Sequence, residues 1–218
     1  MDQHTEAHFD TCALITIDTQ CDTLDGQPLE VPGTSAALPA IRRLADAFRR
    51  HRRPIVHVVR IYRPDASNVD LCRRDKILEG LPVLLEGSSG VQIAPDLFQG
   101  GAPALESELL LSGGVQQVGP NESIIYKPRW GAFYDTPLER RLRDQDVDTL
   151  VFAGCNFPNC PRTSMYEASE RDFRVVLAED ALSGLYDRGR SELMNIGVQL
   201  LSTAAVVEAL DGPHRRTT

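Results

Sequence analysis

The sequence predicts an α/β fold of three layers, in which a mainly parallel, six-stranded sheet is covered by helices on both faces. Short apolar runs of strand length alternate with helical patterns along the chain. Several of these runs are apolar throughout, which is typical of strands buried on both faces of a parallel sheet. The chain has 218 residues, of which 42% are hydrophobic, so a single domain spanning 1–218 accounts for it.

The first half of the chain begins with a strand, a helix and a second strand. The run 12–18, CALITID, predicts a buried strand, and a loop containing glycines and prolines follows it. Thr34 or Ser35 can cap a helix that ends at about His51. The run 54–60, PIVHVVR, predicts the second strand.

The second half of the chain repeats this alternation of strand and helix. The expected strands are SIIYK, TLVFAG, RVVLAED and VQLLST, at 123–127, 149–154, 174–180 and 198–203. Four helices are expected in this half. One begins at about Pro137, a second spans about 162–172, a third lies near Arg190 and a fourth spans 203–210. Such an order of elements builds successive βαβ units, in which the strands are parallel.

The segment at about 95–120 interrupts the alternation. It contains two glycine pairs, Gly100-Gly101 and Gly113-Gly114, on either side of the amphipathic stretch ALESELLL. Because the segment is longer than a usual connection, we interpret it as an inserted surface excursion with one short helix. The alternative interpretation is a flap or a dimer arm beside a functional site.

The charge of the chain argues against two classes of partner. The net charge of −8 and the pI near 5.1 do not fit a nucleic-acid-binding domain or a polybasic membrane-binding surface. No apolar stretch approaches the ~18 residues that a membrane span needs, and the first residues lack the pattern of a signal peptide. We therefore expect a cytoplasmic protein with no nucleic-acid or membrane partner.

The five cysteines predict reduced thiols. Their number is odd, and cytosolic proteins keep thiols reduced. No pair of cysteines or histidines has the spacing of a structural zinc site. We expect Cys12, Cys72 and Cys155 to be small buried hydrophobic residues.

Three strand ends carry residues that could take part in catalysis. Asp18 ends the first strand, Lys127 ends SIIYK, and the turn AGCNFPNCPRTS, at 153–164, follows TLVFAG. Ligands of parallel α/β sheets bind beyond the carboxyl ends of the strands. A thiol in the turn needs a base and a cation to become nucleophilic, and the other two strand ends supply both. No glycine-rich nucleotide-binding motif follows any strand.

Four blocks of the sequence resemble the isochorismatase-like cysteine hydrolases. They are LITIDTQCDTL, GSSGVQIAPDL, YKPRWGAFYDTPLERRLR and DTLVFAGCNFPNCPRTSMYEASERDFRVVLAEDALSG, and they occur in the family's order over about 13–210. The resemblance implies a Rossmann-like isochorismatase fold. By position in the motifs it also implies a catalytic triad, with Asp18 as the general base, Lys127 as its cationic partner and Cys160 as the nucleophile.

The resemblance also implies a non-proline cis peptide bond between Cys155 and Asn156. This bond would turn the backbone amides of Asn156 and Cys160 toward a common oxyanion site. Cys160 would begin a helix, where the helix dipole and Lys127 both favour a thiolate. We therefore expect alkylation to label Cys160 quickly even at mildly acidic pH, and Cys155 to remain unreactive.

The lysine block also suggests substrate-binding residues. Trp130 and Phe133 are expected to form a wall of the pocket beside Lys127, and Gln20 to contact the substrate. Nicotinamidases of the family carry an Asp-x-His metal motif soon after the second strand, but VVRIYRPDASNVDL has no histidine there. His57 lies inside that strand, where we expect a core position. The resemblance thus implies no metal and no other cofactor.

The activity implied by the resemblance is hydrolysis of a C–N bond, amide or ureido, in a small molecule. The reaction would pass through an acyl-enzyme on Cys160, without a metal. Two alternatives remain open: a vinyl-ether hydrolase of the isochorismatase type that uses Asp18, and a non-catalytic binding or assembly protein on the same fold. The family resemblance further implies a homo-oligomer, either a dimer or a tetramer.

Overall fold

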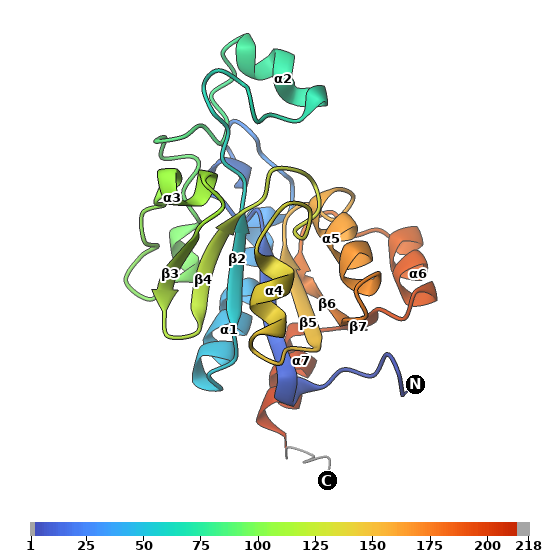
Figure 1. Ribbon diagram of the computed structural model, residues 1–218. Helices are drawn as coiled ribbons and strands as arrows, with labels where there is room; N and C mark the ends of the chain where they lie inside the picture. The colour runs from blue at the N-terminus through green and yellow to red at the C-terminus, as the bar shows by residue number, and fades with distance from the viewer. Residues whose placement is uncertain (1–2, 213–218) are drawn as a thin grey trace.

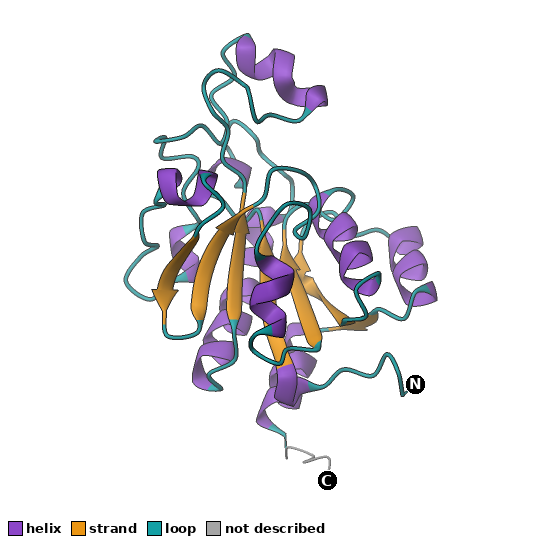
Figure 2. Ribbon diagram, in the orientation of Figure 1, coloured by secondary structure: helices purple, strands orange, loops and turns teal. Residues whose placement is uncertain are grey.

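A computed structural model describes residues 3–212; the ends of the predicted domain, 1–2 and 213–218, lie outside the described residues. The centre of the molecule is a seven-stranded sheet with the order β3-β4-β2-β1-β5-β6-β7 (Figures 1 and 2). The strands are β1 (Cys12–Ile17), β2 (Ile55–Val59), β3 (Val115–Gly119), β4 (Glu122–Tyr126), β5 (Thr149–Gly154), β6 (Arg174–Leu182) and β7 (Gln199–Leu201). β3 and β4 pair antiparallel, and all other neighbouring strands are parallel.

Helices cover both faces of this sheet, so the predicted α/β class is confirmed. Helices α1 (Thr34–Arg50) and α7 (Thr203–Asp211) pack on one face, and α4 (Leu138–Arg143), α5 (Cys160–Ser169) and α6 (Asp187–Asn195) on the other. The two faces hold separate apolar clusters, because alternate residues of each strand point to opposite sides. Leu14 and Ile15 illustrate this, since consecutive residues of β1 belong to different clusters.

The predicted number of six strands was one too few. The seventh, β3, lies within the segment 95–120, which also contains the short helices η3 (Pro95–Leu97) and α3 (Ser107–Leu111). A tight turn at Pro120 and Asn121 connects β3 to β4, and β3 forms one edge of the sheet. Its sequence VQQVG has no clear apolar alternation, because an edge strand is only partly buried.

The predicted cap of α1 was wrong. Gly33 precedes the helix with a φ of 89°, a left-handed conformation that glycine adopts at low cost, and Thr34 is already the first helical residue. The hydroxyl of Thr34 donates to Ser183 Oγ, and that of Ser35 accepts from the backbone N–H of Asp25. Both hydroxyls therefore fix loops, and neither caps the helix.

The helix α2 (Leu71–Leu78) was not predicted, because its sequence LCRRDKIL is short and polar. It stands out beyond the carboxyl ends of the strands, at the top of Figure 1. Only Ile77 of this helix is buried, while Leu71 and Leu78 are 81% and 61% exposed. Cys72 is exposed as well, so the expectation of a buried Cys72 was wrong, whereas Cys12 and Cys155 are buried as expected.

The order of the strands reverses beside β1. On one side of β1 lie β2, β4 and β3, in this spatial order. The next strand along the chain, β5, lies on the other side of β1. Gly154 at the end of β5 has a φ of 121°, and a Cβ there would lie 2.2 Å from the carbonyl oxygen of Ile17. Only glycine permits this approach. The strand ends at Asp18 and Gly154 are thereby side by side, at the point where ligands bind in such sheets.

Within the described residues, no helix is both long and apolar enough to span a membrane.

Candidate active site

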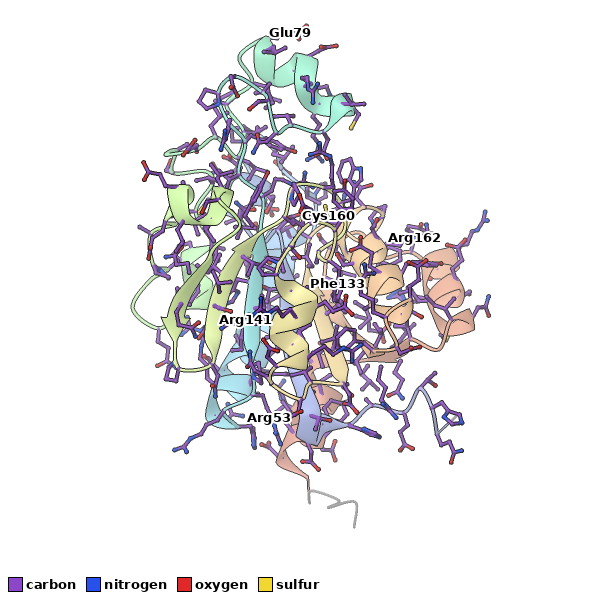
Figure 3. The ribbon with its side chains drawn as sticks, viewed as in Figure 1. Arg53, Glu79, Phe133, Arg141, Cys160 and Arg162 are labelled. Atoms are coloured by element: carbon purple, nitrogen blue, oxygen red, sulfur yellow. The ribbon has the colours of Figure 1, made fainter. Side chains whose placement is uncertain are left out.

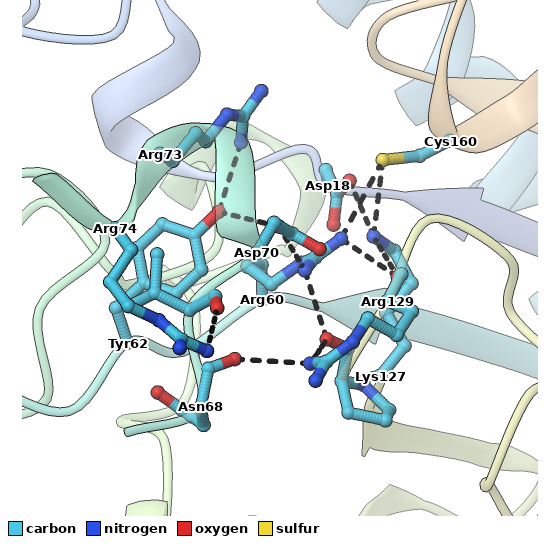
Figure 4. Close-up of polar contacts among 12 residues, drawn as sticks. Asp18, Arg60, Tyr62, Asn68, Asp70, Arg73, Arg74, Lys127, Arg129 and Cys160 are labelled. Atoms are coloured by element: carbon cyan, nitrogen blue, oxygen red, sulfur yellow. Dashed lines mark hydrogen bonds and ion pairs between the residues drawn. The ribbon is translucent and has the colours of Figure 1, made fainter. Parts of the chain in front are cut away.

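The three predicted catalytic side chains meet at the carboxyl edge of the sheet (Figure 4). The Lys127 Nζ atom lies 2.9 Å from Asp18 Oδ2 and donates a hydrogen bond of 3.2 Å to Cys160 Sγ. It donates a weaker one, of 3.3 Å, to the backbone carbonyl of Arg129. One ammonium group therefore holds the acid and the thiol in a single cluster.

Asp18 is positioned by the end of β1. Its backbone N–H donates to the carbonyl of Val58 on β2, and its carbonyl accepts from the N–H of Gln20. Its φ of 46° lies in the left-handed region that non-glycine residues rarely adopt. The second carboxylate oxygen, Oδ1, is buried and has no hydrogen-bond partner in the described part of the chain. This oxygen keeps its full capacity to accept a hydrogen bond.

Lys127 is completely buried, with 0% exposure. Its backbone N–H donates to the carbonyl of Val59, which extends the pairing of β4 with β2 and fixes the direction of the side chain. A buried ammonium ion without a counter-ion would be very unfavourable, and the contact with Asp18 provides the compensation.

Cys160 is the first residue of α5, as predicted. The hydroxyl of Ser164, one turn later, donates to the carbonyl of Cys160 and accepts from the backbone N–H of Ala132. In the same way Glu167 accepts from the N–H of Phe133. These bonds join the first two turns of α5 to the loop that follows Lys127, so the thiol and the ammonium group are held in a fixed relation.

The turn between β5 and α5 contains the expected cis peptide bond between Cys155 and Asn156. Asn156, Asn159 and Cys160 all line the pocket into which the thiol points. The backbone N–H groups of Asn156 and Cys160 have no acceptor among residues 3–212. Backbone amides without an acceptor can donate to an oxyanion, and the predicted role of these two residues remains a prediction.

Burial of the Cys160 thiol opposes the expected thiolate. Burial raises its pKa to about 11, and the negative charge of Asp18 also raises it, whereas Lys127 and Arg60 lower it. Burial and the nearby carboxylate outweigh the cations and the helix dipole. A nucleophilic role for this thiol would therefore require a base, and Asp18 is the carboxylate whose charge acts on it.

We expect the alkylation of Cys160 by iodoacetamide to accelerate about tenfold per pH unit from pH 7 to 9, because only the thiolate reacts. Labelling at mildly acidic pH should be slow. The rate is measured by mass spectrometry in a Cys72→Ser background, since Cys72 is exposed and reacts independently. A labelling rate that stays constant above pH 7 would show that the thiolate already predominates there.

Arg60 is a site residue that the sequence analysis missed. It follows β2 directly, and its guanidinium is 1% exposed. It donates to Asp70 Oδ2 at 2.7 Å and to the carbonyl of Arg129 at 2.7 Å, and its Nη2 lies 4.0 Å from Cys160 Sγ. A charged residue directly after a buried strand, at the same level as Asp18 and Lys127, was the signal that could have identified it.

Gln20 does not have the predicted role of contacting a substrate. It is fully buried, and its Nε2 donates to the carbonyls of Arg60 and Val91, at 2.8 and 2.5 Å. Its Oε1 accepts from the N–H of Arg60 at 2.8 Å. The side chain is thus occupied by backbone groups, and it positions Arg60 at the end of β2.

Phe133 and Trp130 also differ from the predicted pocket wall. Phe133, labelled in Figure 3, is buried in the apolar cluster on the sheet face that α4, α5 and α6 cover. Its ring packs against Phe173 at a centroid distance of 5.8 Å. Trp130 is half-buried and lies under two guanidinium groups, at 5.5 Å from Arg60 and 5.0 Å from Arg73. It therefore supports residues that line the pocket. The alternation of side chains along the loop separates the two rings.

His57 occupies the core position that was expected. Its Nδ1 lies 2.7 Å from the Thr16 hydroxyl and its Nε2 lies 2.8 Å from Glu122 Oε1. The same carboxylate forms an ion pair with Arg49. The described residues contain no cluster of three or more histidine, cysteine or acidic side chains that could hold a metal ion.

The pocket above these residues is small, with a volume of about 50 Å³. Its walls combine the charged site with apolar side chains, and the lining residues are Asp18, Thr23, Leu29, Val31, Arg60, Arg73, Leu84, Cys155, Asn156, Asn159 and Cys160. Larger hollows on the surface, such as the one beside Arg63 and Glu108, contain none of the three predicted catalytic residues. The chemistry is concentrated in the small pocket.

This fold, with acid, amine and thiol at the switch point of the sheet, defines an isochorismatase-like α/β protein. The sequence model of the isochorismatase domain matches residues 12–207, which is most of the chain. The chain belongs to the isochorismatase family.

Relatives with names and solved structures show the range of this family. The maleamate amidohydrolase of Pseudomonas putida is 29% identical over 78% of this chain and 71% of its own length. A protein of Arabidopsis thaliana named "Probable inactive nicotinamidase" is 26% identical over 86% of this chain and 90% of its own. The crystal structure of an isochorismatase family protein from Desulfovibrio vulgaris has a TM-score of 0.78 and 28% identity, covering 93% and 99% of the two chains.

Proposed function

We propose that the protein is a cysteine amidohydrolase that cleaves an amide or ureido C–N bond in a small molecule, without a metal ion. The observation that carries this proposal is the cluster in which Lys127 Nζ contacts both Asp18 Oδ2 and Cys160 Sγ. The name of the Pseudomonas putida relative supports a C–N bond as the target. The volume of the pocket, about 50 Å³, favours a substrate whose reacting group is as small as a carboxamide.

In the first half of the proposed reaction, the Cys160 thiol gives its proton to the carboxylate of Asp18 as sulfur attacks the carbonyl carbon. The C=O bond becomes a C–O⁻ bond, and the amides of Asn156 and Cys160 donate to this oxygen. The intermediate collapses, the C–N bond breaks, and the departing nitrogen takes the proton from Asp18. Ammonia or an amine leaves, and the acyl group remains on sulfur as a thioester.

In the second half, Asp18 acts as a base once more. It accepts a proton from a water molecule, whose oxygen attacks the thioester carbonyl. The C–S bond then breaks, sulfur regains the proton from Asp18, and the acid product is released. Throughout the cycle Lys127 stabilises whichever of its two partners, carboxylate or thiolate, carries the negative charge.

Ammonia release from a panel of small primary amides and ureido compounds tests this proposal. We expect turnover with at least one compound, and mass spectrometry after rapid acid quenching should detect the acyl group on the peptide containing Cys160. The vinyl-ether alternative would instead release no ammonia and leave the thiol unmodified. The absence of ammonia and of any thioester, together with no turnover of a vinyl ether such as isochorismate, would favour the non-catalytic alternative, for which the name of the Arabidopsis thaliana relative is a precedent.

We expect exhaustive chelation to leave turnover unchanged. The position at which nicotinamidases of the family have a metal-binding histidine is occupied here by other residues, and His57 is fully engaged by Thr16 and Glu122. The initial rate with the best amide of the panel is compared before and after dialysis against EDTA. Activity that is lost on chelation and restored by zinc or iron would contradict a metal-independent mechanism.

We expect the protein to form a homo-oligomer, a dimer or a tetramer. Leu71 and Leu78 on α2 are large apolar side chains that this chain alone leaves exposed. Size-exclusion chromatography with light scattering at micromolar concentration measures the mass directly. A species of 24.1 kDa, the mass of one chain, would contradict this expectation.

A further inference from the structure

Arg73 reaches the pocket from outside the body of the fold. It lies on the protruding helix α2 and lines the same pocket as Cys160. Its guanidinium is half-buried, with the Cζ atom 5.0 Å from the centroid of the Trp130 ring. Its Nη1 donates to the hydroxyl of Tyr62 at 3.0 Å (Figure 4). Two aromatic residues and one hydrogen bond therefore direct this side chain toward the site.

The positive charge of Arg73 is not compensated. Asp18 forms its ion pair with Lys127, at 2.9 Å, and Asp70 forms its ion pair with Arg60, at 2.7 Å. Among residues 3–212, Arg73 has no carboxylate within the 4.0 Å that defines an ion pair. The two carboxylates of the site, Asp18 and Asp70, are thus each paired with one cation. The third cation, Arg73, has no carboxylate partner among the described residues.

An unmatched guanidinium in a pocket wall favours an anionic ligand. It has five N–H donors in a planar fork, and Tyr62 uses only one of the two Nη groups. A carboxylate fits this fork with two parallel hydrogen bonds, which are about twice as strong as bonds between neutral groups. Leu29, Val31 and Leu84 form apolar walls of the pocket, which keep the local dielectric constant low.

We infer that Arg73 binds a carboxylate of the substrate, and that the substrate is therefore an anion. This inference rests on the proposed amidohydrolase function. One end of the substrate carries the amide or ureido group that Cys160 attacks, and the other end carries a carboxylate that Arg73 holds. Neutral amides and neutral ureas lack the second contact. Arg73 is then the residue that selects the substrate class, and α2 becomes attached to the body through the bound ligand.

The neighbouring Arg74 provides a matched control. It is also half-buried on α2, and its Nη2 donates to the carbonyl of Val69 at 3.1 Å. It does not belong to the pocket lining, and its side chain points in another direction from that of Arg73 (Figure 4). Replacing either arginine by methionine removes the same charge from the same helix, but only one replacement removes it from the pocket.

The experiment uses two pairs of probes in which an isopropyl group replaces the carboxylate. The pairs are succinamate with 4-methylpentanamide, and N-carbamoylglycine with isobutylurea. Ammonia release gives kcat/KM for each compound. We expect the wild-type protein to prefer the anion of a pair by roughly 10- to 100-fold, the value of a charged hydrogen-bonded contact. Arg73→Met should bring this ratio close to one, and Arg74→Met should keep the wild-type ratio.

Calorimetry on the Cys160→Ala protein measures binding of the same probes without turnover. Tighter binding of the anions, lost in the Arg73→Met/Cys160→Ala double variant, supports the inference whether or not ammonia is released. Equal or undetectable binding of both members of each pair overturns it.

If the anions bind through Arg73 but the wild-type protein releases no ammonia from them or from the wider panel, the proposed function fails and the carboxylate site stands. If neutral members turn over as fast as anions, the proposed function stands and the carboxylate site fails.

Discussion

Replacing Cys160 by alanine should lower kcat by about three orders of magnitude or more, as removal of a catalytic nucleophile does. The physical reason is that the Cys160 Sγ atom is the thiol beside Lys127 Nζ, at 3.2 Å. Without the sulfur no thioester forms, and the remaining oxyanion amides can only assist direct attack by water. The measurement is ammonia release with the best amide of the panel, using enough protein to detect a rate a thousandfold below the wild type.

Cys155→Ala is the matched control for this variant. Cys155 is buried in the same turn, and the side chains of Thr34, Ser183 and Thr23 surround its sulfur. Burial raises the pKa of its thiol, with Asp18 adding to the effect. Among residues 3–212, Lys127 and Arg60 donate to the sulfur of Cys160 and not to that of Cys155. We expect this variant to keep most of the wild-type activity, because only the backbone of residue 155 takes part in the oxyanion turn.

The two cysteine variants together separate the candidate mechanisms. An inactive Cys155→Ala protein beside an active Cys160→Ala protein would overturn the assignment of the nucleophile. Full ammonia release by both variants would exclude a cysteine nucleophile and would leave Asp18 as the base that activates water for direct attack on the amide. Thermal unfolding of each variant establishes that a loss of rate does not come from a loss of structure.

Replacing Asp18 by asparagine should lower kcat by about three orders of magnitude as well. The thiol has a pKa of about 11, so its attack depends on a base that removes the proton, and the amide of asparagine cannot do so. The same replacement leaves the buried Lys127 without a counter-ion. Loss of one partner of a buried pair costs about 3–5 kcal/mol, so the variant should also unfold at a lower temperature. The rate is measured where circular dichroism shows the native fold.

Glu122→Gln separates these two effects. Glu122 is also a buried carboxylate, held by His57 and Arg49, but it lies outside the pocket that contains Cys160. Burial by itself would raise its pKa, yet the hydrogen bonds and charges of His57 and Arg49 lower it to about 2. We expect this variant to lose stability without a comparable loss of kcat. A similar fall of kcat in both variants would mean that the effect of Asp18→Asn comes from destabilisation.

The sequence determined the elements that depend on local patterns. Strands buried on both faces must be apolar throughout, so the runs 12–18 and 149–154 were visible without a structure. Asp18, Lys127 and Cys160 were found because a strand end in a parallel sheet places its side chain at the ligand-binding edge. The motifs then assigned a role to each residue. These conclusions required only the order of residues along the chain.

The tertiary structure decided what depends on residues distant in sequence. Strand β3 is placed by its pairing with β4, and α2 is held to the body by the contacts of Arg73 with Tyr62 and Trp130. Neither segment has a periodic apolar pattern in its sequence. Gln20 was predicted to contact the substrate, but in the structure it supports Arg60. The reason is that its amide group donates to backbone carbonyls of two other segments.

The raised pKa of Cys160 and the unmatched charge of Arg73 follow from burial and from the pairing of neighbouring charges. The pKa of Cys160 and the charge balance around Arg73 both depend on charged groups that come together only in the folded protein. A local sequence pattern therefore cannot predict them.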